Sequence, residues 1–110
     1  MCTDGFGGSI AQADGVATLV LRGEADLASR ADFEALVAEV LATDAPAIVV
    51  DVQLLRYLES ACLRGLLHAH STAEAGGRTL VVHGATGIVR RVLEIAGVAE
   101  LLLDDPDEPS

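Results

Sequence analysis

Two apolar runs near the start of the chain are separated by Asp14-Gly15, a dipeptide typical of tight turns. Glycine at the second turn position accepts the positive φ angle that a type I′ turn requires. We therefore expect Ser9–Ala13 and Val16–Arg22 to pair as an antiparallel hairpin.

The segment that follows has the spacing of an amphipathic helix. Its large apolar residues recur three and four positions apart, on one helical face: Phe33, Leu36, Val37, Val40 and Leu41. Ser29 is placed to cap this helix, and Asp32, three residues later, completes a pair similar to a capping box. Ala45-Pro46 should end the helix, because proline cannot continue the helical hydrogen bonding.

The middle of the chain predicts a buried strand and a second helix. Ala47–Val52 is apolar on both faces, which suits a central strand, and Gln53–Glu59 is interpreted as a connection. A helix begins near Ser60 and ends at Gly76-Gly77, because glycine adopts the left-handed conformation at little cost. The inner face of this helix carries four residues: Leu63, Leu66, Leu67 and His70.

The last third of the chain predicts two more strands around a helix. Arg78–His83 has the composition of a third buried strand. A helix is expected over Gly87–Ala96, with Thr86 as its cap and Gly97 directly after its end. Glu100–Leu103 is expected to form a short final strand.

The expected elements follow the order β-β-α-β-α-β-α-β. A hairpin followed by βαβ units predicts an α/β fold, with a mixed, mostly parallel sheet and helices packed against it. The first strand should lie at an edge of that sheet. We expect one domain over residues 1–103 and a disordered acidic tail over residues 104–110, which carry four acids and two prolines.

Composition narrows the class of partner. With 110 residues and 51% hydrophobic residues, the chain can bury one core. Seven arginines against 17 acidic residues give a net charge of −10, which repels phosphate backbones and anionic lipid surfaces. The longest stretch without a charged residue, Thr79–Val89, is far shorter than the roughly 20 residues that cross a bilayer. We therefore expect a protein partner, no nucleic acid and no direct membrane insertion.

The N-terminal residues have neither the basic nor the apolar region of a signal peptide, so we expect a cytoplasmic protein. Cys2 and Cys62 form no CxxC pair, and we interpret them as reduced thiols.

Three tests for catalytic or ligand chemistry are negative. Gly84–Gly87 lacks the glycine spacing of a phosphate-binding loop. His68 and His70 are two positions apart on a predicted helix, so they point to different faces and cannot share a metal ion. Ser60 lacks the flanking glycines of a nucleophile elbow. We expect neither an enzyme, nor a metal site, nor a cofactor.

Two polar segments remain, and both precede helices: Gly23–Asp26 and Glu59-Ser60. Ser60 has two interpretations. It is either a plain N-cap, which stabilises the fold by about 1 kcal/mol, or an exposed hydroxyl that a kinase can reach. A phosphate at a helix N-terminus gains from the helix dipole and adds about −1.5 to −2 charges to the surface.

The whole pattern resembles the STAS domain of bacterial anti-sigma factor antagonists over about residues 8–103. The family's opening strand ends in Gly-Glu-x-Asp, as does Leu21–Asp26 here. Its central element, an apolar strand, a short link and Asp-Ser-Ser/Thr-Gly-Leu, is similar to Ile48–Leu63. Gly76-Gly77 and the arginine-containing helix Val89–Val98 occupy matching places.

The resemblance implies a regulatory binding protein. In this family the unphosphorylated domain binds an anti-sigma factor, usually an ATP-binding serine kinase, and so frees the sigma factor. The kinase phosphorylates the first serine of the motif, which breaks the complex, and a PP2C-type phosphatase restores it. By position that serine is Ser60. The residues expected at the partner-binding surface are Glu24, Asp26, Glu59, Ser60, Cys62 and Arg64.

The motif departs from the family at three positions. Glu59 replaces Asp, Ala61 replaces the second Ser/Thr, and Cys62 replaces Gly. Cys62 has two interpretations: a redox-sensitive thiol with a lowered pKa in the first helical turn, or a small hydrophobe packed beside Leu66. The family's last C-terminal helix also has no counterpart in the sequence pattern.

Two other functions stay open. A degenerate motif also suits a non-phosphorylated STAS subunit of a membrane lipid-transport complex. A small-ligand sensor would instead need an apolar pocket with convergent polar groups, which sequence alone does not reveal.

Overall fold

The computed structural model describes residues 5–102. Strand β1 (Gly7–Ala13) pairs antiparallel with β2 (Val16–Ala25). The two turn residues, Asp14 and Gly15, have φ angles of 55° and 81°, and a type I′ turn needs positive φ at both positions. The predicted hairpin is confirmed, although β2 continues past Arg22 to Ala25.

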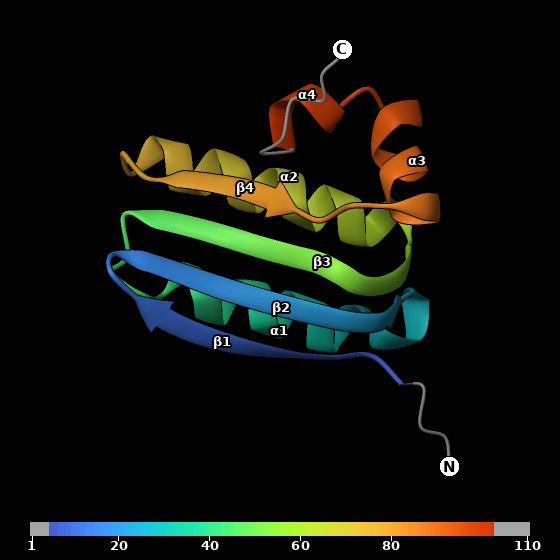
Figure 1. Cartoon of the computed structure of the whole chain (residues 1–110), viewed down its shortest axis with the longest axis horizontal. Coiled ribbons are helices and arrows are strands. Elements are labelled where there is room, and N and C mark those ends of the chain that lie inside the picture. Colours follow the sequence, from blue (N-terminus) through green and yellow to red (C-terminus); the bar gives the residue numbers. More distant parts are fainter. Residues whose placement is uncertain (1–4, 103–110) are drawn as a thin grey trace.

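The sheet has the strand order β1-β2-β3-β4, with β1 at an edge as predicted. Strands β3 (Ala47–Leu58) and β4 (Thr79–His83) complete it, and both the β2–β3 and the β3–β4 pairs are parallel (Figure 1). The mixed, mostly parallel α/β architecture is therefore confirmed.

Strand β3 has 12 residues and is twice as long as the apolar run Ala47–Val52 that predicted it. The prediction that Gln53–Glu59 is a connection is wrong, because the strand continues to Leu58 alongside the end of β2. Two irregularities in the β2–β3 register accommodate the extension, and they return Leu55 and Leu58 to the buried face.

Helices α1 (Arg30–Leu41) and α2 (Ser60–Ala75) cover one face of the sheet (Figure 1). The apolar face predicted for α1 is confirmed, since Phe33, Val37 and Val40 are buried and the other two members pack partly against the core. The strands contribute alternate residues to the same core: Ala17, Leu19, Leu21, Ile48, Val50, Val52, Leu80 and Val82. The intervening residues of β2, β3 and β4 are only partly buried or exposed, on the face that looks toward the viewer in Figure 1.

Arg78 joins the end of α1 to the start of β4. Its Nη2 donates to the Leu41 carbonyl at 2.9 Å and its Nη1 to the Thr43 carbonyl at 2.8 Å. The last carbonyls of a helix have no intrahelical partner, and the guanidinium supplies donors for them. Gly77, with φ of 77°, reverses the chain just before this arginine, as expected for the end of α2.

The C-terminal part is helical rather than extended. Helix α3 (Gly87–Ile95) contacts β3 and is followed by a short helix, α4 (Ala99–Leu102). The predicted strand Glu100–Leu103 is therefore wrong within the described residues, and the observed order ends in α-α. The Leu102 amide donates to the Val98 carbonyl at 3.0 Å, and the Leu102 side chain is fully buried. Residues 103–110, including the predicted disordered tail, lie outside the described residues.

Candidate protein-docking site

The two polar segments singled out in the sequence meet where the parallel strands end. The Glu59 amide donates to the Ala25 carbonyl at 2.8 Å, which joins the start of α2 to the end of β2. Glu24 lies opposite Tyr57 in the β2–β3 register, and its carboxylate is 3.8 Å from the Arg56 guanidinium. Both side chains of this ion pair are about half exposed, so it contributes little to stability. The grouping of Gly23–Asp26 with Glu59-Ser60 at one edge is therefore observed.

Asp26 has a structural role in this edge. It caps a short 3₁₀ helix, η1 (Leu27–Ser29), and exchanges hydrogen bonds with Ser29 in a capping box. Ser29 holds the predicted N-cap position of α1, but the predicted pair with Asp32 is wrong, because the Ser29 hydroxyl donates instead to Asp26 and to the Glu24 carbonyl, 3.0 Å away. Helix α1 begins at Arg30 with no side-chain cap bond from Ser29.

Ser60 is the first helical residue of α2 and is exposed. The interpretation of Ser60 as an N-cap is wrong, because Glu59 occupies that position with extended angles (φ −81°, ψ 153°) and makes no side-chain cap bond. The first intrahelical bond of α2 runs from the Leu63 amide to the Glu59 carbonyl, at 3.0 Å. The Ser60 hydroxyl makes no hydrogen bond with another residue of the described chain, and Ser60 belongs to the first turn of α2, whose amides have no intrahelical acceptor.

The carboxylate of Glu59, the residue before Ser60, has a buried oxygen without a hydrogen-bond donor among the described residues. Its Oε1 is buried and has no hydrogen-bond partner within residues 5–102. A buried carboxylate oxygen without a donor is costly. Glu59 thus places at this edge a carboxylate oxygen that receives no hydrogen bond from the described residues.

Cys62 is fully buried, so its thiol cannot contact a partner directly in this structure. Burial, followed by the negative charges of Glu59 and Glu34, raises the pKa of the thiol above its ordinary value. The expectation of a lowered pKa is therefore wrong: the first-turn position matters less than the loss of solvent. The alternative, a small hydrophobe in the core, agrees with this burial.

Arg64, one turn further along α2, is exposed and forms no ion pair with the described residues.

The two histidines of this helix differ in burial. His70 is buried with its Nε2 3.6 Å from Glu74 Oε2, whereas His68 is exposed. They point to different sides of the helix, as their spacing predicted.

Exposed apolar side chains at this edge were missed by the sequence analysis. Leu54 and Tyr57, at the end of β3, are 60% and 39% exposed. Leu27 in η1 and Ile88 at the start of α3 are 69% and 58% exposed, and each follows the end of a neighbouring strand. The sequence carried a signal for them, since both β3 residues are large and apolar although they fall in the segment interpreted as a connection. We call Leu27, Leu54, Tyr57 and Ile88 the apolar rim.

The described fold is that of a small α/β domain with an N-terminal hairpin and a helix-covered mixed sheet. The chain belongs to the STAS family: residues 9–104 match the family described as "Mlab, STAS domain". No curated protein matches the sequence.

Anti-sigma factor antagonists are among the solved structures with the same fold. One from Mycobacterium paratuberculosis has a TM-score of 0.83 and 22% identity, covering 99% of this chain and 90% of its own. The unphosphorylated form of the antagonist SpoIIAA has a TM-score of 0.75 and 16% identity, over 92% of this chain and 90% of its own. The phosphorylated form of Bacillus SpoIIAA has a TM-score of 0.68 and 16% identity, covering 92% of this chain and 93% of its own. No helix among the described residues is long and apolar enough to cross a membrane.

Proposed function

We propose that the protein is an anti-sigma factor antagonist that acts by binding, in the cytoplasm, and not by catalysis. It binds an anti-sigma factor through the carboxyl edge of its sheet and thereby releases a sigma factor. The partner is of the ATP-binding serine kinase type. The observation that carries the proposal is the exposed Ser60 hydroxyl beside the apolar rim.

The composition of this edge supports docking of a protein. Large apolar side chains that are exposed together in one region mark interaction surfaces, whereas single exposed apolar residues are ordinary. The same segments carry exposed charged groups: the Glu24–Arg56 pair at the ends of β2 and β3, and Arg64 in the first turns of α2. A surface that combines exposed apolar and charged side chains is typical of a transient protein interface.

The position of Ser60 supports regulation by phosphorylation. A phosphate on this hydroxyl would lie at the N-terminus of α2, where free amides and the helix dipole stabilise it. The same phosphate would place about two negative charges beside apolar side chains that must be desolvated on docking. Phosphorylation by the kinase would therefore break the complex, and a PP2C-type phosphatase would restore it.

Intact-mass measurement tests this proposal. After incubation with the cognate kinase-type anti-sigma factor and ATP, the protein should gain one phosphate, and Ser60→Ala should gain none. A complex that forms without any phosphate gain would leave a constitutive antagonist. The absence of both a complex and a phosphate would contradict the proposal.

A second candidate is a non-phosphorylated STAS subunit of a membrane lipid-transport complex. It is favoured by the altered motif, in which Ala61 offers no second hydroxyl and Cys62 is buried. Co-purification with an ABC permease complex, with no mass gain in the kinase assay, would favour this candidate.

A further inference from the structure

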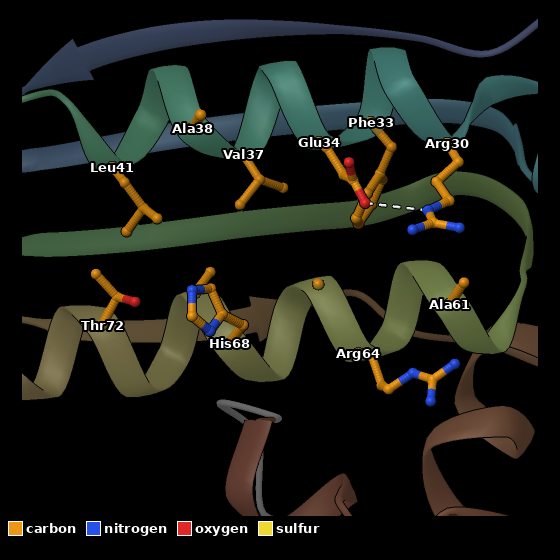
Figure 2. A pocket seen from close by; sticks show the side chains of 12 residues that line it. Arg30, Phe33, Glu34, Val37, Ala38, Leu41, Ala61, Arg64, His68 and Thr72 are labelled. Carbon is orange, nitrogen blue, oxygen red and sulfur yellow. Dashed lines mark hydrogen bonds and ion pairs between the residues drawn. The ribbon is translucent and has the colours of Figure 1, made fainter.

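Helices α1 and α2 leave an elongated groove between them (Figure 2). The helices run in the same direction, because each connects two neighbouring parallel strands. The facing positions are unequal in size: α1 supplies Phe33, Val37 and Leu41, whereas α2 supplies Ala61, Gly65 and Ala69. The small side chains of α2 do not fill the space beside α1, and a cavity of about 590 Å³ results.

The dimensions of the groove suit a small, elongated molecule. Small-molecule sites commonly have volumes of roughly 300–1,000 Å³ and mainly apolar linings. The lining runs from Arg30 to Leu41 along α1 and from Ala61 to Thr72 along α2, which corresponds to about 17 Å of helix. An added Cβ at Gly65 would lie 3.3 Å from the Phe33 ring, so a side chain at this position would crowd the ring at the floor of the groove.

One end of the groove is cationic, although the chain as a whole is strongly acidic. Arg30 extends between the two helices at the end where both begin, and among residues 5–102 only Glu34 engages its guanidinium, through Nε at 3.1 Å from Glu34 Oε2 (Figure 2). Arg64 leaves α2 near the same end, on the flank turned away from α1, and pairs with none of the described residues. The positive ends of both helix dipoles lie there too. An anionic group is favoured at this end.

We propose that the α1–α2 groove binds an amphiphilic carboxylate, with its alkyl chain along the apolar floor and its carboxylate at Arg30. Removal of each methylene from water favours binding, and the guanidinium donors recognise the carboxylate. This ligand site does not depend on the proposed anti-sigma factor binding. It adjoins that surface, because Ala61 and Arg64 follow Ser60 in the first turns of α2.

Sodium decanoate is a suitable probe, used below its micelle concentration with the ¹⁵N-labelled full chain in 0.15 M salt, which screens the net charge. We expect saturable amide shifts at Ala38, Gly65 and Ala69, and none at Val20 or Val49 on the uncovered face of the sheet. Butanoate, which keeps the carboxylate but loses most of the chain, should bind at least about tenfold more weakly.

Matched variants locate the site. Ala38 and Ala31 are both exposed on α1, but only Ala38 lines the groove. Ala38→Phe should weaken decanoate binding at least about tenfold by filling the groove, and Ala31→Phe should leave it unchanged. Arg30→Gln should weaken binding about two- to fivefold, whereas Arg91→Gln, at an exposed position of α3, should not.

Three results would overturn the proposal. Shifts that never saturate, or that spread over the whole surface, would indicate non-specific adsorption. Equal binding of decyltrimethylammonium would show that Arg30 does not select an anion. Equal effects of Ala38→Phe and Ala31→Phe, with both variants folded by their melting curves, would place the ligand outside the groove.

Discussion

Asp26 and Ser29 hydrogen-bond to each other in both directions. The Ser29 amide donates to Asp26 Oδ1 at 3.1 Å, while the Asp26 amide donates to Ser29 Oγ at 2.9 Å. The acid of the Gly-Glu-x-Asp motif therefore shapes the loop beside Ser60. A change of charge at Asp26 would alter the loop as well as the surface, so the two effects have to be separated by choice of variant.

Loss of the Ser29 hydroxyl should destabilise the protein. Ser29→Ala removes the bonds to Asp26 and to the Glu24 carbonyl and should lower the free energy of unfolding by about 1 kcal/mol or more. Urea denaturation measures this loss. Ser71→Ala, at an exposed position of α2, is the control and should change stability far less.

Two substitutions at Asp26 distinguish its shape from its charge. Asn is as good an N-cap as Asp, so Asp26→Asn should keep the stability, whereas Asp26→Ala should lose about 1 kcal/mol. If the partner binds the negative charge of Asp26, Asp26→Asn and Asp26→Ala should weaken binding equally in a titration with the anti-sigma factor. Weakening by Ala alone would mean that the partner needs only the shape of the loop.

The Cys62 pKa gives a pH dependence of defined sign. Because the pKa of this thiol is raised in the folded state, the unfolded state releases its proton first as the pH rises. The unfolded state then binds fewer protons than the native one, so stability falls above about pH 8.5, the ordinary cysteine pKa. The stability from this group is fully present below that pH and is lost as the pH rises through the folded pKa.

Denaturation at pH 7 and pH 9.5 measures this slope, in a Cys2→Ser background that leaves one thiol. Adding Cys62→Ala should lower stability at pH 7, because a cavity replaces the thiol, but should flatten the fall toward pH 9.5. An unchanged slope in that variant would mean that other groups cause the fall.

The apolar rim should contribute to docking more than exposed apolar residues elsewhere. Leu54→Asp places a charge at the proposed interface and should weaken binding to the anti-sigma factor about tenfold or more. Ile95→Asp makes the same change at the last residue of α3, where the side chain is 78% exposed. Calorimetric titration of both variants measures the difference, and equal weakening would argue against the rim.

Local chemistry explains which parts of the fold could be predicted from the sequence. Asp14-Gly15 specifies its turn by itself, and the spacing from Phe33 to Leu41 specifies the buried face of α1. The extension of β3 could not be predicted in this way, because its bulges depend on the pairing with β2. The final strand was predicted wrongly because a short apolar run fits a strand as well as a helix. The contacts that bury Leu102 in the core are tertiary and cannot be predicted from this run alone.

The candidate site shows the same division. The positions of Glu24 and Ser60 at one edge followed from the order of strands and helices. The capping role of Asp26, the burial of Cys62 and the raised pKa of its thiol depend on tertiary neighbours. The α1–α2 groove is also a tertiary feature, since the small residues of α2 leave a cavity only because α1 lies beside them on the same face of the sheet.

The central claim is that the anti-sigma factor docks over Ser60 and is displaced by charge there. At the first helical position Asp and Ala are both tolerated, so Ser60→Asp and Ser60→Ala should each stay within about 0.5 kcal/mol of the wild-type stability. Ser71→Asp, further along α2 and also exposed, adds the same charge at a distance.

The most direct measurement is therefore a binding titration of the anti-sigma factor with the wild type, Ser60→Ala, Ser60→Asp and Ser71→Asp. The account predicts wild-type affinity for Ser60→Ala and Ser71→Asp and at least a tenfold loss for Ser60→Asp. Binding of Ser60→Asp as tight as that of the wild type would contradict it.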